Sequence, residues 1–413
     1  MPISIDRRTR VDADITSIQP DQFFADHLPG LVARHGALTA RGIDKLAARP
    51  LAIEVGERSW TFIRSGAGDT IDVVDGIVDD AFVVTLTDEQ FSEWVQQQRT
   101  FNAFVVGREM RCRNGTEHDI SVWDSLWLTM LEGWPIVDDD IRFLDRDGLP
   151  LDFGRTFSPD DDPADVAHFL REAGFLHLRG WIDPALMSAV AADIDRAVPR
   201  YVKGDGKSWW ATLADGTLRC VRLQEFLDHS PTTEAILRSE SWDRLRRTIA
   251  ADDSLVQAPV EGRCLEALIK PIGVVAGPSD VSFHRDCHFG RHAYSCSSMT
   301  VGIAVTPTSA ENGMLRVVAG SHRVAIPIEV AKTNPYLPVI GLPTEPGDLT
   351  VHLSCTLHES TPPRIAERKV MYGGNFTLAL RSTNNGGPAD GGAALSQLRE
   401  RVYEILLDDK PTA

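Results

Sequence analysis

The sequence has no long apolar run, no closely paired cysteines and no internal repeat. No apolar run approaches the roughly 20 residues needed to cross a bilayer, and no apolar segment follows the basic residues at 7–10 as a secretory signal requires. The six cysteines include no CxxC pair, which in a chain of this length predicts free thiols in a reducing compartment. We therefore expect a cytoplasmic protein without a membrane span.

Positive charge is also scarce. Lys and Arg number 42 against 59 Asp and Glu, which gives a formal net charge of −17. A field of this sign disfavours nucleic acids and anionic membranes as partners. The 43% of apolar and 24% of charged residues are ordinary for a globular protein and exclude a disordered, collagen-like or coiled-coil chain. At about 150 residues per domain, the length predicts two or three domains.

The first part of the chain predicts a compact α/β unit over residues 41–135. A hairpin is expected around Gly56, and a capping box at Thr87 and Gln90 begins a helix. Residues 121–132 predict a second helix. The strand-like runs are residues 51–55, 60–63, 70–74 and 81–86. An acidic, proline-containing stretch from 138 to 162 then marks a domain boundary.

The second part begins with a helix between the N-cap pair Asp162-Pro163 and Gly174, followed by a strand at 175–178 and a helix at 184–197. From 265 to 380, short strands separated by Pro, Gly and Asn predict a sandwich or jelly-roll barrel. Within it, Asn312-Gly313 predicts a type I′ hairpin. A flexible polar segment (383–392) and a short amphipathic helix (395–405) are expected to end the chain.

The chemistry is concentrated at His284-Arg285-Asp286. On a strand, residues i and i+2 share a face, so His284 and Asp286 would present an imidazole and a carboxylate together. One more histidine would complete the set of two His and one carboxylate that holds non-haem Fe(II) and leaves three positions open. His358 is the candidate: if residues 347–360 stay extended, its polar face also carries Thr350, His352, Ser354 and Thr356.

Arg368 follows ten residues after His358. A 2-oxoglutarate cosubstrate would chelate iron through its 2-oxo acid end, and its far carboxylate, once buried, would need a partner. The planar fork of arginine bonds a carboxylate through two parallel hydrogen bonds, which suits Arg368 to that position.

Other interpretations of these histidines remain open. His322 competes with His358 as third ligand, although a Gly-Ser-His turn more often uses its His to bond the backbone. His284, His288 and His292 would align as zinc ligands on a helix, but Gly290 and the strand-like residues before His284 oppose a helix there. Four further residues have a functional and a structural interpretation. Cys287 is either a metal ligand or a thiol of the core or cavity wall. Trp209 and Trp210 either stack on a substrate or pack within the fold. Arg222 pairs either with an acidic substrate or with a residue of the fold.

Residues 162–381 resemble the phytanoyl-CoA dioxygenase family of Fe(II)/2-oxoglutarate oxygenases. The resemblance is carried by residues 169–175, 180–184, 270–271, 284–286, 311–322, 347–348, 358–360 and 368. It implies a double-stranded β-helix, cupin-like fold with His284, Asp286 and His358 as iron ligands. It also implies Arg368 as the partner of the 2-oxoglutarate carboxylate, with Lys270 and Ser360 at positions that often help to hold the cosubstrate.

The sequence departs from the family pattern at Ala319, where Pro is usual, and at Arg285, where Gln is common. Neither change removes a ligand. Asp286 stands where a halogenase has a small residue that leaves room for a halide, which argues against that reaction.

Residues 80–91 and 103–107 resemble sterol-carrier-protein-2-like domains, which fold as a small sheet with helices around an apolar tunnel. We therefore predict an α+β protein in four parts. These are a sterol-carrier-like α/β domain (1–140), a linker (141–158), the β-helix oxygenase domain (159–382) and a C-terminal segment with a helix (383–413).

The predicted function is an Fe(II)-, 2-oxoglutarate- and O₂-dependent dioxygenase. It would oxidise, by hydroxylation as the default outcome, an unactivated C–H bond of a hydrophobic or natural-product small molecule and release succinate and CO₂. The alternative is a lipid or small-hydrophobe carrier whose oxygenase-like domain is a scaffold. Desaturation, epoxidation or ring formation would use the same ligands, and the sequence leaves the oligomeric state open.

Overall fold

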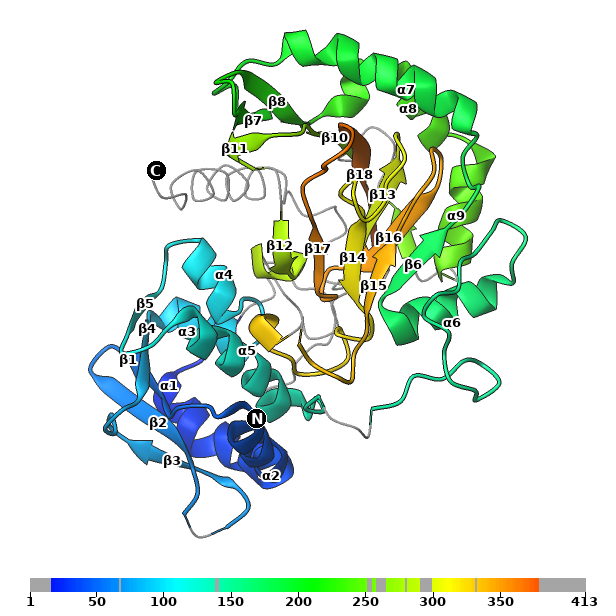
Figure 1. Cartoon of the computed structure of the whole chain (residues 1–413). Coiled ribbons are helices and arrows are strands. Elements are labelled where there is room, and N and C mark those ends of the chain that lie inside the picture. Colours follow the sequence, from blue (N-terminus) through cyan, green and yellow to red (C-terminus); the bar gives the residue numbers. More distant parts are fainter. Residues whose placement is uncertain are drawn as a thin grey trace.

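The computed structural model describes residues 16–66, 68–137, 141–250, 255–257, 265–278, 281–289, 299–330 and 333–378. They form an N-terminal body (residues 16–137) and a larger C-terminal body (residues 141–378) that lie side by side (Figure 1). The expected segments 383–392 and 395–405 lie outside the described residues. Within the described ranges, no helix is both long and apolar enough to span a membrane.

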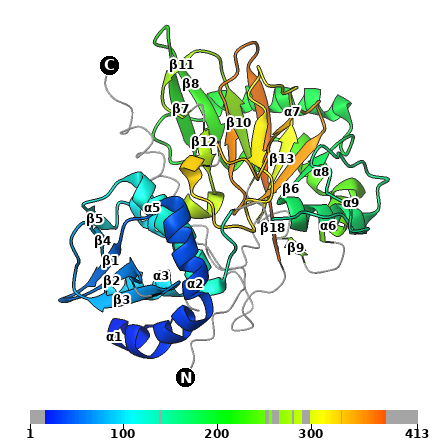
Figure 2. The ribbon, with the colours of Figure 1, turned by 60° about the horizontal axis from the view of Figure 1, so that its bottom comes forward.

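The N-terminal body is a five-stranded sheet with helices packed on one face (Figure 2). The sheet order is β3 (Ile71–Asp75), β2 (Arg58–Arg64), β1 (Leu51–Val55), β4 (Phe82–Leu86) and β5 (Arg111–Arg113). The helices are α1 (Pro20–Gln22), the π-helical η2 (Phe23–His27), α2 (Leu28–Leu46), α3 (Asp88–Val95), α4 (Phe101–Val106) and α5 (Glu117–Glu132).

Local signals account for these elements. Gly56, at φ +60°, turns β1 into its antiparallel partner β2, as predicted. The predicted capping box also forms: the Thr87 hydroxyl accepts from Gln90 N, and the Gln90 side chain accepts from Thr87 N. A second box at Thr116 begins α5.

Aromatic rings fill the space between this sheet and its helices. The Trp94 ring stacks on Trp127 at 3.8 Å between centroids and on Phe101 at 4.9 Å, and Phe24 stacks on Trp60 at 4.1 Å. Such buried rings contribute area and preferred ring geometry together. The resemblance to sterol-carrier domains stays a prediction for this body.

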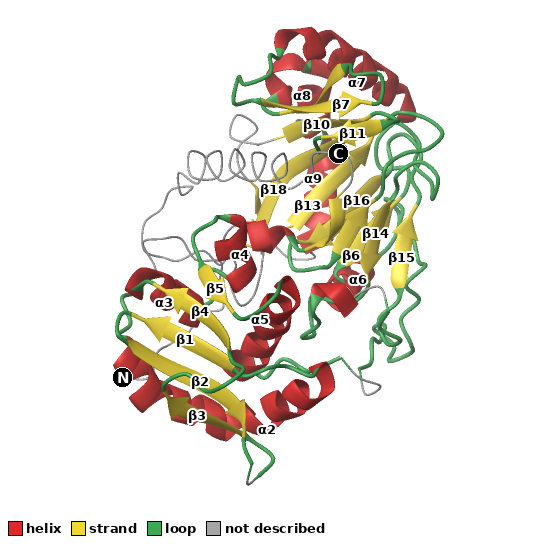
Figure 3. Ribbon diagram, turned by 60° about the vertical axis from the view of Figure 1, so that its left-hand side comes forward, coloured by secondary structure: helices red, strands yellow, loops and turns green. Residues whose placement is uncertain are grey.

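The C-terminal body places two antiparallel sheets opposite each other (Figures 1 and 3). Among the described residues, the larger sheet runs β11 (Val274–Ala276), β7 (Ser208–Leu213), β8 (Leu218–Leu223), β10 (Leu265–Lys270), β18 (Arg368–Leu378), β13 (Met299–Ala304), β16 (Leu349–Leu353) and β6 (Phe175–Leu178), with β9 (Leu255–Gln257) paired to β18. The smaller sheet runs β12 (Val281–His284), β17 (His358–Ser360), β14 (Leu315–Val318) and β15 (Val339–Leu342).

Four helices cover the outer face of the larger sheet: α6 (Pro163–Ala173), α7 (Pro184–Ala197), α8 (Pro231–Leu237) and α9 (Glu240–Ala250). Single turns of 3₁₀ helix lie at η3 (Val198–Arg200), η4 (Phe226–His229), η6 (Asp286–Phe289) and η7 (Ile328–Val330). The predicted ends of α6 are confirmed, because Asp162 caps its N-terminus and Gly174 ends it at φ +81°. Apolar residues of these helices and of the sheet form the main core, while the inner face of the sheet is polar.

The predicted hairpin at Asn312-Gly313 is wrong. The preceding strand β13 belongs to the larger sheet and the following strand β14 to the smaller one, so this turn carries the chain between sheets. Gly313 has a positive φ (68°), whereas Asn312 is not among the positive-φ residues, and a type I′ turn needs both. The Asn312 side chain instead donates to Pro307 O and accepts from Ala366 N, which fixes the crossing.

The expectation that residues 347–360 stay extended is also wrong. β16 ends at Leu353, a turn closed by Thr356 N donating to Leu353 O follows, and β17 begins at His358 in the opposite sheet. His352 and His358 therefore face each other from different sheets, with ring centroids 4.0 Å apart.

Candidate metal centre and cosubstrate pocket

The predicted metal ligands converge. His284 is the last residue of β12 and is paired in register with His358, the first residue of β17. Asp286 lies on η6 rather than on the strand, so the predicted i, i+2 strand geometry is wrong, yet the turn still brings its carboxylate back. Asp286 Oδ1 is 3.5 Å from His284 Nε2 and 3.5 Å from His358 Nε2. One donor atom from each of the three residues lies within 4.8 Å of the others, so the group could hold a metal ion.

Backbone carbonyls orient both imidazoles. His284 Nδ1 is 2.8 Å from Ser282 O, and His358 Nδ1 is 2.9 Å from Thr356 O. A proton assigned to each Nδ1 makes these hydrogen bonds and leaves both Nε2 lone pairs facing Asp286 Oδ1. This second layer of bonds is what fixes the tautomer and rotation of metal-binding histidines.

The protonation states suit metal binding. Burial alone would raise the pKa of the Asp286 carboxyl, but the adjoining imidazoles of His358, His284 and His352 hold that pKa well below its ordinary value. Burial and the neighbouring His358 lower the pKa of His284. The carboxylate is therefore ionised and the His284 imidazole neutral near pH 7, the forms in which both bind metals. Two imidazoles and one carboxylate fit Fe(II) and leave positions open.

The three predicted cosubstrate residues also come together. Lys270 of β10 and Arg368 of β18 are register partners at the end of the larger sheet, and Ser360 reaches them from β17. Arg368 Nη1 donates to Ser360 Oγ (2.8 Å) and Gly313 O (2.6 Å), and Nη2 donates to Tyr372 Oη (3.1 Å). Lys270 Nζ donates to Ser360 O and Oγ at 2.8 and 2.9 Å.

Arg368 is buried, at 3% exposure, and its Nε is a buried donor with no hydrogen-bond partner among the described residues. Buried donors in native proteins are normally satisfied, so an orphaned one indicates a missing acceptor. The residue lines a small cleft between the sheets. The other lining residues are Gly302, Ala304, Thr308, Leu315, Leu342, Thr344, Thr350 and Val370. A carboxylate bound at this cleft would meet the Arg368 guanidinium beside threonine side chains.

Two residues that touch the candidate centre lie outside the predicted ligand set. Thr300 Oγ1 donates to Asp286 Oδ2 at 3.0 Å, and His352 Nε2 lies 3.3 Å from the same oxygen. Sequence reasoning placed His352 near the cavity but missed Thr300. No spacing signal leads from Asp286 to a threonine 14 residues later in another element.

The alternatives resolve against ligand roles. His322 Nε2 bonds Arg171 O at 2.8 Å, as the Gly-Ser-His turn predicted. The helical zinc site is wrong, because His284 lies on a strand, while the His288 side chain and all of His292 are outside the described residues. Cys287 is a buried thiol whose Sγ lies 3.8 Å from that of Cys355.

The aromatic pair and its neighbour have partners within the fold. The Arg222 guanidinium lies over the Trp209 ring at 4.2 Å and forms an ion pair with the buried Glu266. Trp210 Nε1 donates to Ser208 Oγ at 2.8 Å. These contacts account for Arg222 and Trp209 structurally.

The N-terminal body reaches the candidate centre. α4 packs against η6, which carries Asp286, and Asp124 of α5 accepts from the first two amides of α4, Phe101 N (2.7 Å) and Asn102 N (2.9 Å). α5 packs against η7, where Ile328 N donates to Ser121 Oγ at 2.8 Å.

Arg285 lies where these contacts meet. The side chain is buried and points away from the two ligands beside it, donating to Cys355 O at 3.0 Å and Ile326 O at 3.1 Å. Its charge also acts on the buried Asp124 carboxylate. Arg285, between the two candidate ligands, thus ties their turn to the loop that the N-terminal body touches.

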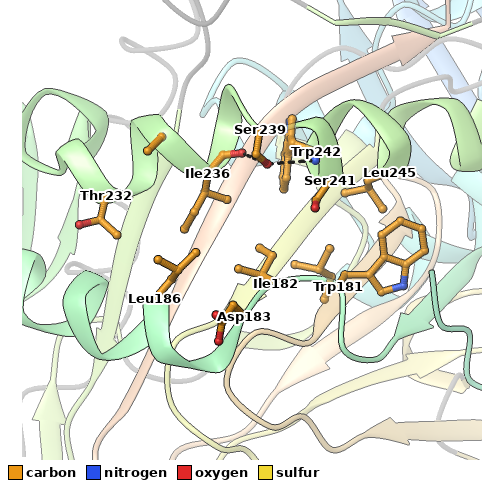
Figure 4. Close-up of a pocket in the computed structure, with 12 residues that line it drawn as sticks. Trp181, Ile182, Asp183, Leu186, Thr232, Ile236, Ser239, Ser241, Trp242 and Leu245 are labelled. Atoms are coloured by element: carbon orange, nitrogen blue, oxygen red, sulfur yellow. Dashed lines mark hydrogen bonds between the residues drawn. The ribbon is translucent and has the colours of Figure 1, made fainter.

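A separate pocket of about 230 Å³ opens among the helices on the outer face of the larger sheet (Figure 4). Its walls are mainly apolar, with Ile182, Ile236 and Trp242 among the lining residues and Asp183 and Ser241 among the polar ones. It contains none of the predicted metal or cosubstrate residues.

Three solved structures illustrate the similarity of this chain to known proteins. AviO1 from Streptomyces viridochromogenes Tue57 is 20% identical, with 53% of this chain and 96% of that chain covered and a TM-score of 0.42. The non-heme alpha ketoglutarate dependent epimerase SnoN from nogalamycin biosynthesis is 21% identical, with 55% of this chain and 86% of that chain covered and a TM-score of 0.42. EctD from S. alaskensis, solved with 2-oxoglutarate and 5-hydroxyectoine, is 14% identical, with 59% of this chain and 86% of that chain covered and a TM-score of 0.41.

No curated protein matches the chain. Residues 170–369, however, match the sequence profile of the phytanoyl-CoA dioxygenase (PhyH) family. That range includes all six residues predicted for metal and cosubstrate binding, which the fold gathers between its two sheets. The chain therefore carries a phytanoyl-CoA dioxygenase family domain at residues 170–369.

Proposed function

We propose that this protein is an Fe(II)- and 2-oxoglutarate-dependent dioxygenase that hydroxylates an unactivated C–H bond of a hydrophobic or natural-product small molecule. One observation carries the proposal. A cluster of two histidines and a carboxylate, with donor atoms within 4.8 Å, lies between the same two sheets as a buried arginine with an unpaired donor. A metal held at the first site would bind the 2-oxo acid end of a 2-oxo diacid. The arginine at the second site would bind the carboxylate at the other end of the same molecule.

Each residue has a defined task in this proposal. His284, Asp286 and His358 hold the metal, and Arg368 binds the far carboxylate of 2-oxoglutarate. Ser360 accepts hydrogen bonds from both Arg368 and Lys270, so it fixes the guanidinium before the cosubstrate arrives. Iron, when bound, supplies the activation of O₂, and the fold supplies orientation and a site shielded from water.

The first experiment measures succinate release from 2-oxoglutarate with added Fe(II). His284→Ala and Asp286→Ala should abolish it, because each removes one of three ligands. Arg368→Ala should chiefly raise the KM for 2-oxoglutarate. His322→Gln is the matched control, since His322 bonds a backbone carbonyl away from the ligands. Full turnover by His284→Ala would show that the metal assignment is wrong.

The substrate requires a second experiment. Enzyme, Fe(II) and 2-oxoglutarate are incubated with a cell extract, and the metabolites are compared by untargeted mass spectrometry with those from the His284→Ala sample. A gain of one oxygen on an apolar metabolite supports hydroxylation, whereas a loss of two hydrogens indicates desaturation or ring formation. A carrier without catalysis would give neither change and no iron-dependent succinate.

A further inference from the structure

The two oxygens of Asp286 have different surroundings. Oδ1 faces the Nε2 atoms of His284 and His358, at 3.5 Å from each. Oδ2 faces the other way, accepting from Thr300 Oγ1 at 3.0 Å and lying 3.3 Å from His352 Nε2. One oxygen is directed at the candidate metal position, and the other is held by two donors from the protein.

These two donors form a cross-strand pair. Thr300 on β13 and His352 on β16 are direct antiparallel partners in the larger sheet, whereas both candidate histidine ligands come from the smaller sheet. Asp286 itself lies on a 3₁₀ turn, so no strand fixes the direction of its carboxylate. The cross-strand pair therefore supplies the restraint that the turn lacks.

His352 is buried and has a polar contact with Asp286. Its side chain is 2% exposed, and its Nδ1 is buried without a hydrogen-bond partner among the described residues. The polar contact that the structure gives this ring is the one to Asp286. A histidine with Nδ1 unbonded carries its proton on Nε2, so Nε2–H donates to the carboxylate.

We infer that Thr300 and His352 are positioning residues that hold Asp286 Oδ2 away from the metal, so that the carboxylate binds through Oδ1 alone. The inference rests on the proposed function. Two imidazoles and one carboxylate oxygen take three positions of an octahedral metal, whereas a carboxylate bound through both oxygens would take a fourth. The pair thus preserves the open positions that 2-oxoglutarate and O₂ require.

The test compares His352→Leu, which removes the donor, with His352→Gln, whose amide N–H can replace it. Purified variants are loaded with Fe(II) without oxygen, and 2-oxoglutarate is titrated while the metal-to-ligand charge-transfer absorbance is recorded. We expect His352→Leu to weaken 2-oxoglutarate binding by about 10- to 100-fold, the range by which loss of a hydrogen bond to a metal ligand lowers metal affinity or activity. His352→Gln should recover most of that loss.

His322→Gln is the matched control, because His322 bonds the backbone carbonyl of Arg171 and lies outside both the candidate ligand set and the cosubstrate cleft. Thr300→Val removes the second donor with little change in volume and keeps the test available if His352→Leu does not fold. Because both donors bond one oxygen, the double variant should lose less than the sum of the two single losses on a free-energy scale.

Equal affinities in His352→Leu, His352→Gln and His322→Gln would overturn the positioning role while leaving the oxygenase assignment intact. Absence of the absorbance in the unaltered protein would instead contradict the proposed function. The two failures are therefore distinguishable in one titration series.

Discussion

Replacing Arg285 by methionine should lower the free energy of unfolding by about 3 kcal/mol. The side chain is 7% exposed and donates to Cys355 O at 3.0 Å and Ile326 O at 3.1 Å. Methionine fills much of the same space but donates no hydrogen bond, so two buried carbonyls would lose their donor at about 1–3 kcal/mol each. The loss is partly offset, because the folded protein no longer has to bury a charged guanidinium, and the net decrease in the free energy of unfolding is about 3 kcal/mol.

Thermal and urea unfolding measure this change. For a domain of about 150–250 residues, 3 kcal/mol corresponds to a fall in Tm of about 6–12 °C. Arg219→Met is the control, because Arg219 pairs with Glu367 at the surface and its side chain is 44% exposed. That control should change stability by less than about 0.5 kcal/mol. If Arg285→Met and Arg219→Met have the same Tm and the same free energy of unfolding, the carbonyl contacts of Arg285 do not stabilise the turn that carries the candidate ligands.

Three further substitutions test other parts of the fold. Gly302→Ala places a Cβ 2.7 Å from Thr350 Oγ1 and 2.9 Å from Tyr372 Cε1 in the candidate cosubstrate cleft, so the KM for 2-oxoglutarate in succinate release should rise, and overpacking should lower the free energy of unfolding by about 1–3 kcal/mol. Burial raises the pKa of Asp124 from 3.8 to about 6, so its carboxyl stabilises the fold most below pH 3.8 and that contribution is lost as pH rises through about 6. Asp124→Asn should flatten this fall, of up to about 3 kcal/mol, in urea unfolding at a series of pH values. Trp94→Ala removes a ring stacked on Trp127 and should cost about 3–5 kcal/mol in urea unfolding.

Signals that act within a few residues predicted their elements well. The Thr87 capping box, the Asp162-Pro163 start and the Gly174 end all form as predicted, and the helix expected at 184–197 is α7 with those bounds. These features depend on hydrogen bonds between residues two to four positions apart. The sequence contains both partners of each bond, so the fold adds little to the outcome.

Two of the errors in the β-rich region have a common cause. Both the Asn312-Gly313 hairpin and the extended 347–360 run assume that strands close in sequence stay in one sheet. In this jelly-roll arrangement the chain crosses to the other sheet at both places. Alternation of polar and apolar residues continues through such a crossing, because each sheet has one face toward the same interior. Periodicity therefore cannot show where the crossing occurs.

The candidate ligands were identified despite a wrong local geometry. His284 and Asp286 were expected on one strand face, but the chain turns at Arg285 and the carboxylate approaches His284 from a 3₁₀ turn. Short spacing kept both residues near the same point whichever backbone geometry followed. Thr300 had no such constraint, because only the pairing of β13 with β16 brings it beside His352 and over Asp286.

The relation between the two bodies is the feature that sequence alone could least predict. Ala325, far along the chain in the oxygenase-like part, packs in the aromatic core of the N-terminal body, and its N–H donates to Pro135 O at 2.9 Å. The next residue, Ile326, offers its carbonyl to Arg285. A short path of hydrogen bonds and packing contacts thus runs from the N-terminal core to Arg285, the residue between two candidate ligands. Because every step of that path is a contact within the chain, the N-terminal body supports the surroundings of the candidate metal centre whether or not it also holds a ligand of its own.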